Sequence, residues 1–358
     1  MTATEALLAR VASGDDVLHD ASPGTSGVRG LKSPRRALAS LAYWAGHVGD
    51  YITTPGRREW SIGVYAGSGP FALQPCADVV NPVLTADDVT DRRATFVADP
   101  FMIRVDDVWH MFFEVMDART RRGVIGLATS DDARRWTYRR TVLAEGFHLS
   151  YPHVLRWQGE FFMVPETRNR AGVLLYRARR FPDRWEPVAT LLAGDYVDAT
   201  PFRHDGRWWM PVARGCVSLH LFSADALTGP WVEHPRSPIV EGNPRAARPA
   251  GPVVAVGARR FRLAQQDFPG YGRGVRIYEM LRLSASDYSE RAVADAPLIG
   301  PTGRGWNGHG MHHADVHRLD DGTWIACVDG CRSDGRPPRD QSAKGMSGSQ
   351  FPVVRSAV

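Results

Sequence analysis

Four carboxylates at corresponding places in the sequence are the residues best suited to do chemistry. Asp99 stands in "VADPFM" and Asp198 in "VDATPF", each shortly before a Pro-Phe pair, while Glu114 and Glu166 end the runs "HMFFE" and "FMVPE". Two carboxyl groups across a polar site, one protonated and one ionised, are the minimum equipment for cleaving a glycosidic bond. These residues can act together only if the fold brings them to one place.

The segments that carry these carboxylates belong to a repeated unit. It reads "TFVADPFMIRVDDVWHMFFE" (95–114), "SYPHVLRWQGEFFMVPE" (150–166), "VDATPFRHDGRWWMPVA" (197–213), "RPAGPVVAVGARRFRL" (248–263) and "HHADVHRLDDGTWIACV" (312–328). Each unit has a short apolar strand, a polar turn and a more aromatic or apolar second strand. The turn glycines Gly159, Gly206 and Gly257 lie 47 and 51 residues apart. A period near 50 residues is typical of propeller blades.

A second pair of strands follows each unit except the last, as in "GVIGLATSDDARRWTYRRTVL" (123–143). Four strands per unit and five units predict an all-β fold, a five-bladed β-propeller. The outer strands that the last unit lacks are expected from "REWSIGVYAGSGPFALQP" (58–75), which would close the ring.

The regions that flank the repeats complete the predicted organisation. Residues 1–57 are expected to form an N-terminal extension with one amphipathic helix at about 34–52, where Leu38, Leu41, Trp44 and Val48 share a face. The propeller is predicted over 58–331, and the turn-rich segment 332–358 is expected to be a loosely ordered tail.

The innermost strand of each blade starts at the central funnel, so residues in register there should surround one site. Alignment of the repeats places Asp99, Tyr151, Asp198 and Pro249 in register, with His313 or Ala314 in the fifth blade. The side chains predicted to bind substrate around this funnel are Tyr151, His153, Glu114, Arg248, Gln266, His312, His313 and Asp315.

Histidine is concentrated in "WNGHGMHHADVH" (306–317), which invites a metal hypothesis because imidazole is a common metal ligand. Alternation along a strand places His313, Asp315 and His317 on one face and His312 on the other. One face alone could not supply every ligand without help from another blade. The alternative is that His312 or His313 donates hydrogen bonds to sugar hydroxyls, and no cofactor is expected to be required.

The charge and composition of the chain limit the kinds of binding partner that we expect. The formal charge is +5, yet Lys32 and Lys344 are the only lysines and the arginines are spread along the chain. We therefore expect no nucleic-acid binding, and a solvated rim or an anionic ligand such as a phosphorylated substrate instead. The sequence has neither a secretory signal pattern nor a run of membrane-spanning length, so a cytoplasmic protein is expected.

Several motifs resemble known families. "ADPF" is similar to the opening of blade one in the five-bladed propellers of glycoside hydrolase family 43 and its β-fructosidase relatives. "EWSIGVY", "VADPFM", "HLSYPHV", "MVPE" and "RPAGPVV…AQQD" more closely resemble the N-terminal domain of plant glucosamine inositolphosphorylceramide transferase and its bacterial stand-alone relatives, over roughly residues 58–330.

The resemblance to the hydrolases implies a ligand and catalytic roles. Related propellers sometimes hold a cation in the axial channel through a His of the fifth blade, so His313 would be the ligand of such a cation. Asp99 would be the base or nucleophile, and Asp198 or Glu166 the acid. Tyr151 stands where those hydrolases have a second Asp and would orient Asp99, while Asp198 replaces their acidic Glu.

Three functions follow from these patterns. The first is an enzyme that cleaves a glycosidic bond of a sugar or glycoconjugate with carboxylates in the axial funnel. The second is glycosyl transfer to an acceptor, in the biosynthesis of a glycan or a secondary metabolite. The third, motivated by the replaced acid positions, is a carbohydrate-binding module without catalysis.

Overall fold

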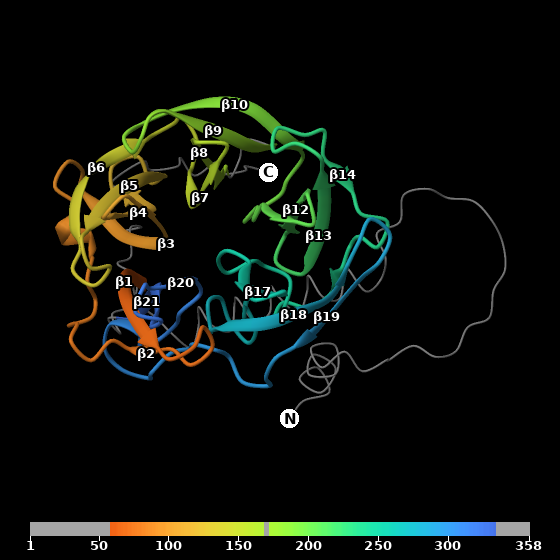
Figure 1. Ribbon diagram of the computed structural model, residues 1–358. Coiled ribbons are helices and arrows are strands. Elements are labelled where there is room, and N and C mark those ends of the chain that lie inside the picture. The colour runs from red at the N-terminus through yellow and green to blue at the C-terminus, as the bar shows by residue number, and fades with distance from the viewer. Residues whose placement is uncertain (1–57, 168–171, 334–358) are drawn as a thin grey trace, which may run out of the picture.

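The computed structural model describes residues 58–167 and 172–333, and it shows five antiparallel sheets arranged around a central axis (Figure 1). This confirms the predicted five-bladed β-propeller. The predicted helix at 34–52 lies outside the described residues, as does the tail beyond Ser333. No helix within the described ranges is long and apolar enough to cross a membrane.

Each blade contains at least four strands, which follow one another from the axis outward. Blade one has β3 (Ala94–Val105), β4 (Val108–Asp117), β5 (Gly123–Ser130) and β6 (Thr137–Leu143). Blade two has β7 (Ser150–Trp157), β8 (Glu160–Glu166), β9 (Gly172–Arg180) and β10 (Arg184–Ala193). Blade three has β11 (Phe202–His204), β12 (Arg207–Arg214), β13 (Ser218–Ala224) and β14 (Val232–Glu233), with β15 (Val240–Glu241) also paired to β13. Blade four has β16 (Val254–Val256), β17 (Arg259–Gln265), β18 (Val275–Leu283) and β19 (Tyr288–Ala292).

The fifth blade joins the two ends of the propeller. Its inner strands are β20 (Ala314–Arg318) and β21 (Trp324–Ser333), and its outer strands are β1 (Arg58–Gly67) and β2 (Gln74–Pro75). β1 pairs with β21 in unbroken antiparallel register from Arg58↔Ser333 to Gly67↔Trp324. The ring is therefore closed by backbone hydrogen bonds between segments at opposite ends of the sequence. Two short 3-10 helices, η1 (Ala86–Asp88) and η2 (Gly305–Asn307), lie in the connections.

The apolar cores lie between neighbouring blades. Phe112 packs with residues of blade two such as Met163, whereas the next residue, Phe113, packs with residues of blade five such as Ile62. Consecutive strand residues point to opposite faces, and both faces of a blade are covered, which explains apolar runs such as "HMFF". Burial of each such side chain contributes about 1.5–3 kcal/mol to stability.

The first three blades share a backbone distortion at the residues that face the axis. Asp99, Tyr151 and Asp198 adopt left-handed backbone conformations, with φ of 53°, 45° and 55°. Irregularities in strand pairing flank the first two of these residues, between Ala98 and Phe101 and between Ser150 and His153. Such bulges redirect side chains, and a positive φ is costly for a residue as bulky as tyrosine. The shared distortion supports the register derived from the repeats.

Trp306 of η2 fixes the connection that leads into β20. Its ring fills a slot on blade five, where Cβ atoms added to Gly63 and Gly330 would lie 2.5 Å and 2.4 Å from ring atoms. The same connection is held by Asn307, whose side chain donates to the hydroxyl of Tyr65 at 3.0 Å. The segment before His312 is therefore anchored to the blade.

This packing predicts that Gly330→Ala lowers the free energy of unfolding by about 1–3 kcal/mol, because the new methyl group overlaps the Trp306 ring. Gly69→Ala is the matched control, since a Cβ at Gly69 meets no atom within 4 Å. Urea denaturation followed by tryptophan fluorescence measures both. Equal stability of the two variants would show that the slot is not close-packed.

Candidate functional site

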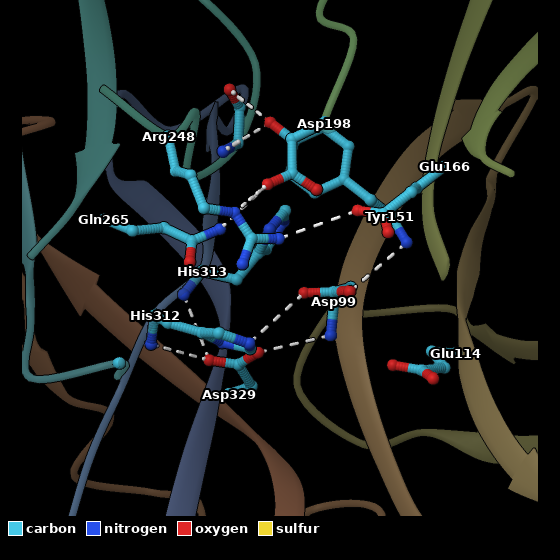
Figure 2. Close-up of polar contacts among 12 residues, drawn as sticks. Asp99, Glu114, Tyr151, Glu166, Asp198, Arg248, Gln265, His312, His313 and Asp329 are labelled. Carbon is cyan, nitrogen blue, oxygen red and sulfur yellow. Dashed lines mark hydrogen bonds and ion pairs between the residues drawn. The ribbon is translucent and has the colours of Figure 1, made fainter. Parts of the chain in front are cut away.

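Six carboxyl groups from all five blades converge at one end of the propeller axis. Each belongs to a residue that is at most 7% exposed: Asp99, Glu114, Glu166, Asp198, Asp267 and Asp329. Figure 2 shows all of these except Asp267 around a common centre. The structure thus brings together the four carboxylates singled out in the sequence and adds Asp267 and Asp329.

The second strands of blades one, two and five supply one level of this arrangement. Glu114 pairs with Ala98 and Glu166 with Ser150, one residue before the distorted positions. Asp329 follows Val328, the partner of Ala314 in blade five, so it occupies the corresponding place. The repeat alignment ended at Val328 and missed Asp329 by one residue.

Asp329 organises the side of the site that belongs to blade five. One carboxylate oxygen accepts hydrogen bonds from the backbone N–H groups of His312 and His313, both at 3.0 Å. The other lies 2.6 Å from Nδ1 of His312 and accepts from the backbone N–H of Asp99 at 3.2 Å. Nε2 of His312 then lies 3.7 Å from Oδ1 of Asp99. Asp329, His312 and Asp99 form a continuous polar chain.

Burial and mutual charge set the protonation of this chain. Burial raises the pKa of Asp99 to about 7, with His312 opposing the shift and Asp329 and Asp198 adding to it. Burial alone would lower the pKa of His312, but the ion pair with Asp329 outweighs it and raises the pKa to about 9. The pKa of Asp329 is lowered because its interactions with His312 more than offset burial. Asp99 can therefore gain or lose a proton near neutral pH.

Arg248 holds the second pair of carboxyl groups. Its Nε lies 2.7 Å from Oδ2 of Asp198, and Nη2 lies 3.6 Å from Oε2 of Glu166. Gln265 also donates to Oδ2 of Asp198, at 3.2 Å. Burial, followed by the charge of Asp198, raises the pKa of Glu166 well above its usual range, although Arg248 opposes the shift. Glu166 therefore keeps a proton that it can donate.

Tyr151 connects the blades beneath these groups. Its backbone N–H donates to Oδ2 of Asp99 at 3.2 Å, which holds that carboxylate in place. Its hydroxyl lies 2.9 Å from Oγ1 of Thr200 and contacts both the N–H and the carbonyl of Gly251. These contacts join blade two to blades three and four, and the Tyr151 side chain is fully buried.

The other predicted substrate-binding residues contact different groups. His153 and His313 are buried against Phe101, and burial lowers the pKa of each to about 4. Asp315 accepts from the backbone N–H of Met102 at 2.7 Å. Gln266 accepts from Arg276 at 3.0 Å, and its neighbour Gln265 is the residue that reaches Asp198.

An aromatic wall borders His312. Trp60 stacks on the imidazole with ring centroids 4.1 Å apart, and Tyr271 meets the imidazole edge-on at 5.1 Å. The guanidinium of Arg248 lies over the Tyr271 ring, 5.5 Å from its centroid. Sequence reasoning missed these roles, although Trp60 lies within the quoted motif "EWSIGVY" and Tyr271 follows "AQQD".

The residues closest to a metal-binding arrangement within the described ranges are Asp99, His312 and Asp329, whose ligand atoms lie within 4.8 Å of one another. His312 and Asp329 already bind each other through Nδ1, so a cation would meet Nε2 of His312 and Asp99, with Asp329 behind the imidazole. His313 is not part of this group, and its candidacy as a ligand stays a prediction.

Comparison with known proteins places this geometry in a family. Residues 54–331 match the family described as glucosamine inositolphosphorylceramide transferase 1, N-terminal. Glucosamine inositolphosphorylceramide transferase 1 of Oryza sativa subsp. japonica is 31% identical over 317 residues, which cover 82% of this chain and 42% of that protein. The Arabidopsis thaliana protein of the same name is 32% identical over 319 residues, covering 80% and 42%. The chain therefore spans about two fifths of the length of these relatives.

Solved structures share the fold at low sequence identity. The catalytic domain of a Coprinopsis cinerea GH62 α-L-arabinofuranosidase aligns with a TM-score of 0.53 at 14% identity, over 78% of this chain and 98% of that one. A putative glycoside hydrolase from Bacteroides ovatus aligns with a TM-score of 0.53 at 13% identity, over 73% and 98%. The match to 54–331 and the identity to the plant proteins show that this chain belongs to the family of the N-terminal region of glucosamine inositolphosphorylceramide transferase 1.

Proposed function

We propose that the axial site catalyses glycosyl transfer, in which a sugar moves from a donor to a hydroxyl group of a glycoconjugate acceptor. The observation that carries the proposal is Asp99, a buried carboxyl whose pKa is about 7 and which faces His312. A carboxyl with a pKa near the working pH suits general acid–base catalysis. The names of the plant relatives, which are transferases, support transfer over hydrolysis.

The geometry suggests a division of labour. Asp99 accepts the proton of the attacking hydroxyl as the new carbon–oxygen bond forms, and Glu166 donates a proton to the oxygen that leaves the anomeric carbon. Asp198 is held by Arg248 and Gln265 and positions Arg248 beside Glu166. His312, fixed by Asp329, supplies positive charge next to Asp99 as that carboxyl ionises.

The charge balance suggests the sugar class. Among the described residues that meet at this site, six carboxyl groups stand against two cationic groups, Arg248 and His312. An ammonium group would relieve the repulsion that helps to raise several carboxyl pKa values. We therefore favour an amino sugar, in keeping with the glucosamine in the relatives' name. Arg248 is held by carboxylates, so it gives no support for binding a phosphate group. A phosphorylated donor therefore stays a prediction.

A carbohydrate-binding role without catalysis is the second candidate. The chain spans 42% of the length of its plant relative. The remaining length of that relative has room for a separate catalytic domain, which favours a binding role for this one. In that case the buried carboxylates would recognise a sugar without turnover.

We predict that Asp99→Asn abolishes turnover, with a loss of at least about 100-fold, because the variant cannot accept a proton. The assay supplies aryl glycosides of glucosamine and of neutral sugars with and without alcohol acceptors, and separates products by mass. Acceptor-linked products indicate transfer, and free sugar indicates hydrolysis. Ligand binding that survives in Asp99→Asn, with no turnover by either protein, would establish the binding role instead.

For an active wild-type protein, the same site predicts a bell-shaped dependence of kcat/KM on pH. Activity should rise through about pH 7 as Asp99 loses its proton and fall through about pH 9 as His312 loses its own. A profile that is flat between pH 6 and 8 would contradict the role of Asp99.

Substitution of Asp99 and substitution of Asp329 should have different effects on the stability of the protein at pH 8. The folded protein binds the Asp99 proton more tightly than the unfolded chain, so this group makes stability fall as pH rises from about 4 to about 7. Asp99→Asn should therefore be as stable as wild type or more stable, by about 1–3 kcal/mol. Asp329→Asn should lose about 3–5 kcal/mol, because it leaves His312 without its ion pair. Denaturant titration measures both, and equal losses would contradict the assignment.

A further inference from the structure

Trp60 links the strand that closes the propeller to the polar chain of the site. It lies on β1, opposite Cys331 of β21, and is 6% exposed. Its ring stacks on the imidazole of His312, with centroids 4.1 Å apart and planes inclined by 25°. The stack therefore connects β1 to the residue that faces Asp99.

The ion pair with Asp329 does not by itself fix the orientation of the His312 imidazole. It holds Nδ1, at 2.6 Å, whereas Nε2 is the atom that lies 3.7 Å from Oδ1 of Asp99. A ring that is held at one atom can still tilt about that atom. A stacked neighbour fixes the plane of the ring, and the two contacts together determine where Nε2 points.

The stack also suits the charge of the imidazole. Burial lowers the pKa of His312, but the charge of Asp329 outweighs burial and raises the pKa to about 9, so the ring is cationic at neutral pH. A cation over the face of a tryptophan ring is attracted to it, and more strongly where water is excluded. Trp60 and His312 are both buried, so their contact is of this stronger kind.

Close packing holds the indole of Trp60 in place. Trp60 shares a small apolar cluster with Ala98, the residue that precedes Asp99. Gly272 lies at the edge of the stack, where an added Cβ would be 2.8 Å from Cη2 of Trp60 and 3.3 Å from Cβ of His312. The indole thus packs beside both members of the pair formed by Asp99 and His312.

Hydrogen bonds fix Gly272 in turn. Its N–H donates to Oδ1 of Asp267 at 3.0 Å, and its carbonyl accepts from the N–H of Met311 at 2.8 Å. These bonds join the connection between β17 and β18 to the residue that precedes His312. The indole therefore cannot move toward Gly272 unless the backbone of blade four moves as well.

We propose that Trp60 is a positioning residue of the axial site, which holds the His312 imidazole so that Nε2 faces Asp99. Its part in turnover rests on the proposed glycosyl transfer, in which His312 supplies positive charge beside Asp99. The strand that closes the propeller thus also completes the site.

Crystal structures of variants of the full chain measure the position of the imidazole without turnover. Trp60→Phe keeps a flat ring at this position, whereas Trp60→Leu keeps an apolar side chain without a ring face. Trp109→Leu is the matched control, since Trp109 is 5% exposed and lies edge-on to His317, which pairs with Asp315. Trp60→Met replaces Trp60→Leu if that variant does not fold.

In Trp60→Phe and Trp109→Leu, we expect the distance from Nε2 of His312 to Oδ1 of Asp99 to stay within about 0.3 Å of its 3.7 Å. In Trp60→Leu the distance should exceed about 4.5 Å, beyond the range of an ion pair, or the imidazole should occupy two orientations. An imidazole that keeps its wild-type position in Trp60→Leu overturns the proposal.

Kinetics connect this position with turnover. For an active protein, Trp60→Leu should lower kcat by about 10–100-fold and change KM by less than about threefold, because a displaced group affects the reaction step rather than binding. Trp60→Phe should restore most of kcat, and equal losses in Trp60→Leu and Trp109→Leu would overturn the positioning role. The turnover assay of Asp99→Asn decides separately on glycosyl transfer, so the two proposals can fail independently.

Discussion

The carboxylate of Asp329 is the interaction on which the rest of the site depends. It accepts backbone hydrogen bonds from His312 and His313 in blade five and from Asp99 in blade one, and it pairs with the His312 imidazole. The group that joins the last blade to the first at the axis is therefore also the group that orients the histidine. The same carboxylate therefore joins the first and last blades and positions the candidate acid–base residue.

Other contacts around the axis also join one blade to another. Asp99 accepts from the backbone of Tyr151 in blade two, and the hydroxyl of Tyr151 contacts Thr200 in blade three and Gly251 in blade four. Because each contact joins a different pair of blades, a shift of one blade would move the carboxyl groups of its neighbours. Such preorganisation holds charges close together at a cost that the cores between the blades offset.

Much of the fold and part of the site could be predicted from the sequence, because a repeated sequence unit implies a repeated structural unit. The shared period and the two-sided apolar strands predicted the blades, and alignment placed Asp99, Tyr151 and Asp198 in register, where all three share a left-handed backbone. The misses are of two kinds. Asp329 lay one residue past the end of the aligned unit, and Gln265 rather than Gln266 reaches Asp198, because a one-residue change in register reverses the face of a strand.

The second kind of miss involves contacts that no repeat encodes. The stacking of Trp60 on His312 joins residues far apart in the sequence, and it depends on the pairing of β1 with β21, which places Trp60 opposite Cys331. The alternation of strand residues correctly separated His312 from His313, yet it could not say which one would meet Asp99. Asp329 orients His312 toward Asp99. The position of Asp329 opposite the two histidines follows from the pairing of β20 with β21.

Burial and the contacts around Asp99 raise its pKa to about 7, so this carboxyl can exchange a proton near neutral pH. The direct measurement is a 13C NMR titration of the side-chain carboxyl groups in aspartate-labelled protein, with the Asp99 signal assigned by its absence in Asp99→Asn. An apparent pKa near 7 is predicted for that signal. A value near 4, the ordinary range of an exposed aspartate, would contradict the account.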